Sequence, residues 1–141
     1  MKLQCRKYSH LFDVCLEKVC PEVARHKEEL GVQTDIFFFQ WLQCGFLSVL
    51  PLEVATAIWD LFLIDGTVVF YRVALAIFTM LRGELVKADY ENFIKIITCH
   101  ADKRGLWKDV MDEKTLLSVA GSVSLPFDVG TVLHRYEREN V

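Results

Sequence analysis

The side chains that most often carry chemistry are scattered along this sequence. The 141-residue chain has five cysteines, an odd number with no Cys-x-x-Cys pair, and four histidines that lie far apart. Structural zinc sites need clustered Cys and His ligands, so free thiols in a reducing compartment are the simpler interpretation. No carboxylate pair, Ser/His/Asp set or Gly-rich phosphate loop stands out. We therefore expect no catalytic residue, no cofactor and no metal, and an enzyme with its own active site is the least supported class. The five cysteines are Cys5, Cys15, Cys20, Cys44 and Cys99, and the four histidines are His10, His26, His100 and His134.

Composition excludes two further classes. The net charge of −3 gives no electrostatic reason to expect nucleic acid as a partner. The longest uncharged run, residues 36–52, has 17 residues. A transmembrane helix needs about 20, so we expect a buried core helix there and no transmembrane segment. Hydrophobic residues make up 52% of the chain and the mean hydropathy is +0.26. Such a chain either packs very efficiently or keeps an apolar face for a partner.

Apolar residues recur at helical spacing between Gly and Pro residues, and no strand-like alternation extends over a useful length. The pattern predicts an all-α fold, a helical bundle of about 6–8 helices. The third predicted helix is apolar almost all round, which places it centrally and makes Cys44 a small core hydrophobe. The predicted helices span 3–19, 21–30, 36–49, 51–66, 67–81, 89–98, 113–120 and 126–138, with an irregular link at 100–111.

Local signals set several of the predicted helix ends. Pro21 and Gly31 frame the second helix with Pro at its first position and Gly after its last. The pair Thr34–Asp35 offers an N-cap to the third helix, and Asp112 could cap the helix that starts at Glu113.

Four stretches, taken in order and with their spacing, resemble the TBC domain of Rab GTPase-activating proteins. The resemblance is to the C-terminal half of that domain and is strongest over residues 22–81. It implies that residues 1–141 are one partial domain, in which 126–136 is the closing helix. The stretches are residues 26–32 (HKEELGV), 40–46 (QWLQCGF, similar to QW-x-x-x-x-F), 58–66 (IWDLFLIDG, similar to W-D-x-F plus Gly) and 70–77 (FYRVALAI).

The resemblance implies a regulator of Rab-family small GTPases. The family supplies an Arg from an I-x-x-D-x-x-R motif and a Gln from a Y-x-Q motif, and both motifs lie in the N-terminal half of its domain. Neither string occurs here. We call these two residues the Arg finger and the Gln finger, and we expect that the chain starts after both of them. It would then be the supporting lobe of a GTPase activator rather than an enzyme, and it would be inactive alone. A cytoplasmic location follows, with peripheral association with endomembranes left open.

Two alternatives remain at this stage. The chain could be a catalytically inactive module that binds a Rab or another helical partner, or a helical protein unrelated to GTPases. Finger motifs upstream in the same reading frame would separate the first from a working activator. A surface that the N-terminal lobe covers in the family would be exposed here, so that lobe, or a second copy of the chain, is a further candidate partner.

Four residues stand out as structural rather than catalytic: Trp41, Trp59, Asp60 and Arg72. Both tryptophans lie in apolar helices, which favours core packing over binding hot spots. A lone buried charge is costly, so Arg72 is expected to pair with Asp60 rather than to act as an alternative finger. Trp107, in the irregular link, is the better candidate for a surface tryptophan.

Overall fold

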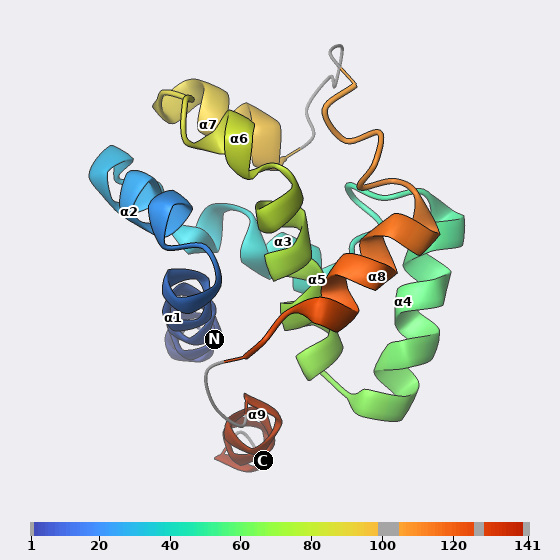
Figure 1. The fold of residues 1–141 in the computed structure, drawn as a ribbon. Helices are drawn as coiled ribbons and strands as arrows, with labels where there is room; N and C mark the ends of the chain where they lie inside the picture. The colour runs from blue at the N-terminus through green and yellow to red at the C-terminus, as the bar shows by residue number, and fades with distance from the viewer. Residues whose placement is uncertain (1, 99–104, 126–128, 140–141) are drawn as a thin grey trace.

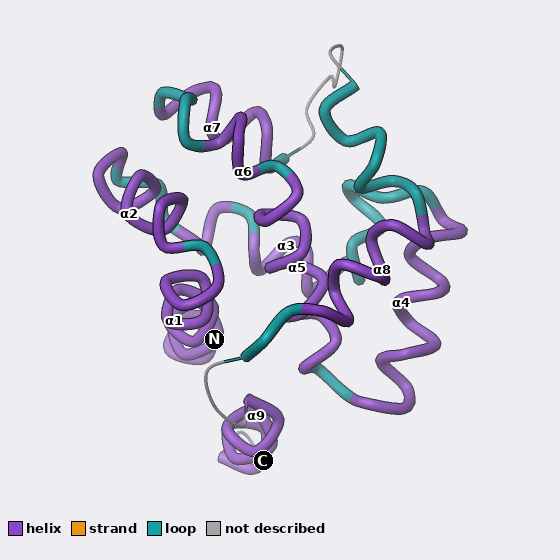
Figure 2. The backbone as a smooth tube through the Cα atoms, in the orientation of Figure 1, coloured by secondary structure: helices purple, strands orange, loops and turns teal. Residues whose placement is uncertain are grey.

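The computed structural model describes residues 2–98, 105–125 and 129–139, with side chains from residue 6 onward. Every regular element in these ranges is helical, and none of them contains a strand (Figures 1 and 2). The predicted all-α fold is therefore confirmed. Two of the nine α-helices, α3 and α6, are shorter than two turns. The elements are α1 (Lys2–Val19), α2 (Pro21–Leu30), the 3-10 turn η1 (Thr34–Ile36), α3 (Phe38–Gln43), α4 (Leu52–Asp65), α5 (Val68–Met80), α6 (Arg82–Leu85), α7 (Tyr90–Ile97), α8 (Glu113–Ser122) and α9 (Val129–Glu139).

Helix α5 is the centre of the molecule. From Val69 to Phe78 all of its side chains are buried except Arg72. A helix that is apolar all round is expected in a core, and α5 packs against α1, α4, α8 and α9 (Figure 1). Phe78 also joins a cluster of aromatic rings contributed by α1 and by the segment around α3, with Phe12 at 5.4 Å and Phe37 at 5.3 Å between ring centroids.

The single helix predicted over 36–49 is wrong. The segment forms η1, then α3, then a series of turns, because Gly45 and Phe46 adopt positive φ angles of 57° and 68°. Such angles are incompatible with a right-handed helix. The turn accommodates Trp59 of α4, whose indole Nε1 donates to the Gly45 carbonyl at 2.8 Å. A Cβ at Gly45 would lie 2.2 Å from that nitrogen. Cys44 is exposed beside this turn, so its predicted burial is also wrong.

Thr34 and Asp35 do not cap α3, whose N-cap is Phe37 with no side-chain hydrogen bond. They tie this segment to α1 instead. The Thr34 hydroxyl donates to the carboxylate of Asp13, and the hydroxyl of Ser9 donates to the carboxylate of Asp35. The predicted cap is therefore replaced by two tertiary hydrogen bonds.

The other predicted helix ends agree closely with the structure. Gly31 ends α2 in the left-handed conformation, with φ 76°, and its amide donates to the Glu28 carbonyl. Asp112 caps α8 by accepting from the amide of Thr115. Helix α8 continues through Gly121, where we predicted its end, and the short α6 was not predicted. The first residues of the last predicted helix, 126–128, lie outside the described residues.

Candidate functional site

The two tryptophans of the α3 and α4 segments lie inside the molecule. Trp41 is 1% exposed and sits against Phe37 and Phe46, with ring centroids 4.9 and 5.6 Å away. Trp59 is partly buried and holds the turn at Gly45 through its indole hydrogen bond. Neither ring is presented to a partner as a large exposed surface.

Asp60 and Arg72 are not brought together. Asp60 lies exposed on α4, where water solvates its carboxylate, and it makes no ion pair within the described residues. Arg72 on α5 is half-buried, and its Nη1 donates to the carbonyl of Val123 at 2.7 Å. The expected ion pair is therefore replaced by a bond to the backbone. Sequence reasoning missed this acceptor because a backbone carbonyl carries no residue-type signal.

The contact from Arg72 has a clear structural role. Val123 is the C-cap residue of α8, where the last backbone carbonyls lack helical partners. A cation there satisfies one of these carbonyls and interacts favourably with the negative end of the helix dipole. Arg72 thus fastens the end of α8 to the central helix α5. In this structure its guanidinium is held at the C-terminal end of α8.

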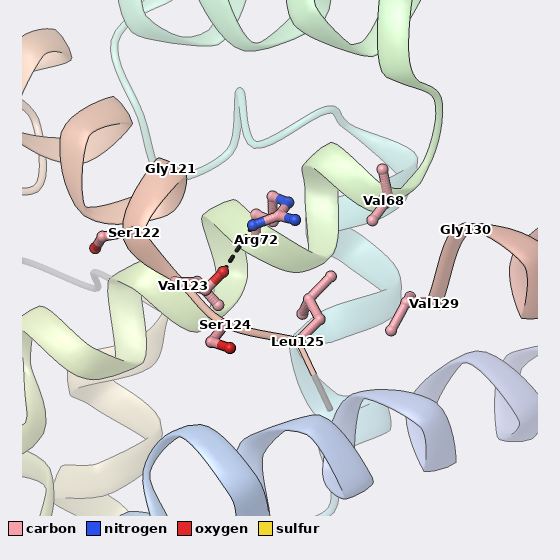
Figure 3. Close-up of a pocket in the computed structure, with 9 residues that line it drawn as sticks. All are labelled: Val68, Arg72, Gly121, Ser122, Val123, Ser124, Leu125, Val129 and Gly130. Carbon is pink, nitrogen blue, oxygen red and sulfur yellow. Dashed lines mark hydrogen bonds between the residues drawn. The ribbon is translucent and has the colours of Figure 1, made fainter. Parts of the chain in front are cut away.

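A pocket of about 700 Å³ opens beside this contact, between α5, the end of α8 and the start of α9 (Figure 3). Arg72 is the only charged side chain among its described lining residues. A guanidinium has five N–H donors, so Arg72 can offer polar contacts there beyond its bond to Val123. The lining residues are Val68, Arg72, Gly121, Ser122, Val123, Ser124, Leu125, Val129 and Gly130.

The described lining combines one guanidinium with serine hydroxyls and apolar side chains. The Ser122 hydroxyl donates to the Val119 carbonyl at 2.8 Å, so it faces no general base. The pocket also lies at the negative end of the α8 dipole, which offsets part of the positive charge of Arg72.

Two other reactive side chains, Cys15 and Tyr71, are buried, whereas Cys44 is exposed. Desolvation raises the pKa of the buried Cys15 thiol to about 11, which makes it a poor nucleophile at neutral pH. Burial also raises the pKa of Tyr71, whose hydroxyl donates to the Tyr8 carbonyl at 2.9 Å. Within the described ranges, no three His, Cys, Asp or Glu residues are grouped closely enough to hold a metal ion.

Trp107 is buried, so its predicted surface position is wrong. It is 1% exposed, and its indole donates to the Ile96 carbonyl at 2.7 Å. Its ring lies 6.4 Å from that of Trp41, between centroids. The turns at residues 105–111, which carry Trp107, therefore pack against the core.

The surface does expose one set of large apolar side chains on a single helix. On α4, Leu63 and Ile64 are each 80% exposed and Leu52 is 60% exposed. None of the helices in the described part of the chain has the length and apolar character needed to cross a bilayer.

Comparison with known proteins identifies relatives of this chain. Residues 1–86 match the family model of the Rab-GTPase-TBC domain. Drainin of Dictyostelium discoideum is 34% identical over 90 residues, which cover 64% of this chain and 20% of Drainin. Mouse ecotropic viral integration site 5 protein is 30% identical over 60% of this chain and 10% of its own length. Human TBC1 domain family member 14 is 30% identical over 64% of this chain and 13% of its own length. The match thus spans a fifth or less of each of these relatives.

Proposed function

Because the chain belongs to the Rab-GTPase-TBC domain family, we propose that it forms the C-terminal supporting lobe of a GTPase-activating domain for Rab-type small GTPases. In this role it contributes a wall for the GTPase but no catalytic side chain. The observation that carries the proposal is the family match over residues 1–86, which includes Trp41, Trp59 and Arg72. We further propose that this action takes place in the cytoplasm, on the surface of membranes that carry a Rab, as the family membership suggests.

The absence of both finger motifs from the sequence supports the proposal that the chain contributes no catalytic side chain. No I-x-x-D-x-x-R string occurs, and none of the four tyrosines is followed two residues later by Gln. An arginine finger is worth roughly 10³ to 10⁵ in the rate of GTP hydrolysis. A chain without it should therefore bind a GTPase with little acceleration of the chemical step.

The geometry of Arg72 argues against a substitute finger. A finger must extend from the surface towards the transferred phosphoryl group. Arg72 instead lies half-buried on the central helix, and its guanidinium is bonded to the end of α8. Withdrawing it would leave the Val123 carbonyl without this donor.

Single-turnover GTP hydrolysis across a panel of Rab proteins tests the proposal. We expect less than about tenfold stimulation by this chain, whereas an intact TBC protein run in parallel should accelerate hydrolysis by roughly 10³ or more. A thousandfold stimulation by this chain would refute the proposal. If stimulation occurs, its loss in the Arg72→Lys variant would show that Arg72 is responsible, because lysine keeps the positive charge but lacks the planar guanidinium group.

A second function, an inactive interaction module, is favoured by the apolar side chains that α4 exposes. Such a module would bind a Rab or another helical partner without any effect on hydrolysis. Calorimetric titration with GTP-loaded Rab proteins separates the two. Binding that competes with an intact activator supports the supporting lobe, and binding without competition supports the separate module.

A further inference from the structure

Helix α4 presents an apolar surface to solvent, on the side opposite its packed face. Its buried residues are Val54, Ala55 and Ile58, which face α5 and α8. At 100° per residue, the exposed residues at 52, 53, 60, 63 and 64 fall on the other half of the helix. Surface helices normally carry charged and polar residues there. We define the α4 outer face as the five exposed residues Leu52, Glu53, Asp60, Leu63 and Ile64.

The α4 outer face lies at an edge of the molecule. In Figure 1, α4 occupies the side opposite α1 and α2, and the chain turns from its lower end into α5. Leu63 and Ile64 lie in the last turn before Gly66, each 80% exposed. Adjacent exposed apolar residues of this size mark an interaction surface more often than isolated ones do.

The charged side chains of α4 itself are all acidic. Residues 28–71 contain six acidic residues and no Lys, Arg or His. All 16 Lys and Arg residues lie outside this segment. Three of the six acids, Glu53, Asp60 and Asp65, are on α4 and exposed, and none of them is in an ion pair within the described residues. The exposed apolar residues of α4 therefore share their helix with three acids and no basic residue.

This charge decides which occupant fits. A cytoplasmic membrane surface is itself negative, so the acids of α4 oppose contact with it. A symmetric dimer through α4 would place the same acids against their copies, which is also unfavourable. A helix with apolar residues on one side and Lys or Arg beside them would bury Leu63 and Ile64 and neutralise the acids.

We propose that the α4 outer face docks a basic amphipathic helix of a partner protein. From Leu52 to Ile64 the face is about 18 Å long at 1.5 Å per residue, which matches three to four turns of a partner helix. Its apolar residues supply the buried area, and its acids set the orientation and speed of association. The inference holds whether or not the chain stimulates GTP hydrolysis.

A pair of synthetic peptides tests the proposal with the full chain. Both peptides have 18 residues and the same leucine face, and their polar positions are all Lys in one and all Glu in the other. Fluorescence anisotropy should show the Lys peptide binding at least about tenfold more tightly at low salt, with the difference falling as salt rises. The double variant Glu53→Lys/Asp60→Lys should reverse the preference.

Site variants locate the binding. Leu63→Ser and Ile64→Ser should each weaken the Lys peptide about tenfold, which is the loss expected for truncating an anchor residue. Tyr90→Ser is the matched control, because Tyr90 is a large residue, 46% exposed, on the separate helix α7. All three positions are exposed, so the melting temperatures should stay unchanged and folding does not confuse the result.

Four results would overturn the proposal. Equal affinity for the two peptides removes the role of charge, and an equal loss in Tyr90→Ser removes the role of α4. A dimer in light scattering that Ile64→Ser abolishes identifies a second copy as the occupant. Binding to vesicles of phosphatidylcholine and phosphatidylserine that Ile64→Ser abolishes identifies a lipid surface instead.

Discussion

The hydrogen bond from Arg72 to the Val123 carbonyl can be tested by its contribution to the free energy of unfolding. Replacing Arg72 with Met keeps an apolar stem against α5 but removes the donor to the Val123 carbonyl. A hydrogen bond to a charged group contributes about 1.5–3 kcal/mol. The favourable field of a helix end adds about 0.3–1 kcal/mol. Arg72 is only half-buried, so we take the lower end and expect a loss of about 2 kcal/mol in the free energy of unfolding.

Asp60→Asn is the companion change, and it separates the observed contact from the ion pair that the sequence suggested. Asp60 is exposed and bonded to no described side chain, so its replacement should alter stability by less than about 0.5 kcal/mol. If the two residues formed a buried pair, removing either partner would cost about 3–5 kcal/mol. The two hypotheses therefore differ by several kcal/mol at Asp60.

Urea unfolding followed by tryptophan fluorescence measures both variants and their combination. We expect the losses to add within about 0.5 kcal/mol, since the residues share no contact. For a chain of this length, a loss of 2 kcal/mol lowers the melting temperature by about 6 °C. A comparable loss in Asp60→Asn, or a coupling energy above about 1 kcal/mol in the cycle, would refute the reasoning.

Three further predictions concern packing and ionisation. Gly45→Ala should cost about 3 kcal/mol or more, because its Cβ would lie 2.2 Å from the Trp59 indole. Gly31→Ala is the control, because Gly31 is also left-handed but has open space, and it should cost about 1 kcal/mol. Trp107→Ala should destabilise by about 3–5 kcal/mol in the same urea experiment, whereas a surface tryptophan would cost little. The folded chain holds the Cys15 proton more tightly than the unfolded chain does. The contribution of this thiol to the free energy of unfolding is therefore fully present below its ordinary pKa of 9.0 and is lost as the pH rises towards about 11. Cys15→Ala should flatten that fall in stability, measured by thermal melts.

Local signals carried the prediction of helix positions. Pro21, Gly31 and Asp112 each act within one turn of the chain, so their effect is visible in a short stretch of sequence. The apolar run of α5 was equally clear, because its burial on all sides leaves few polar positions. These features predicted the positions of α2, α5 and α8 without knowledge of how the helices pack.

The predictions that were wrong share a different cause. In each, a residue distant in sequence determines the local structure. The break at Gly45 exists because Trp59 on the next helix occupies the space beside it. Thr34 leaves its expected cap because Asp13 accepts its hydroxyl. Trp107 is drawn inward by the Ile96 carbonyl and by Trp41. None of these partners is adjacent in sequence, so periodicity and propensity alone could not reveal them.

The candidate site was only partly accessible to sequence reasoning. Arg72 was identified as an unusual charge in an apolar helix, but its acceptor is a backbone carbonyl that any residue could supply. The α4 outer face was hinted at only by the high hydropathy of the chain. Its position became definite when the packed residues Val54 and Ile58 fixed which side of the helix faces inward.

The core extends beyond the part of the chain that matches the family. The match ends at residue 86, yet Trp107, Leu116 and Leu133 are buried in the same cluster as the α5 side chains. Helix α8 packs along α5, and the Tyr136 ring of α9 lies edge-on to Tyr8 of α1, 5.7 Å between centroids. Because burial of apolar surface is the main driving force for folding, α5 needs α8 to cover it. Buried side chains on both sides of residue 86 therefore share one cluster, and α9 packs against α1 through the contact of Tyr136 with Tyr8.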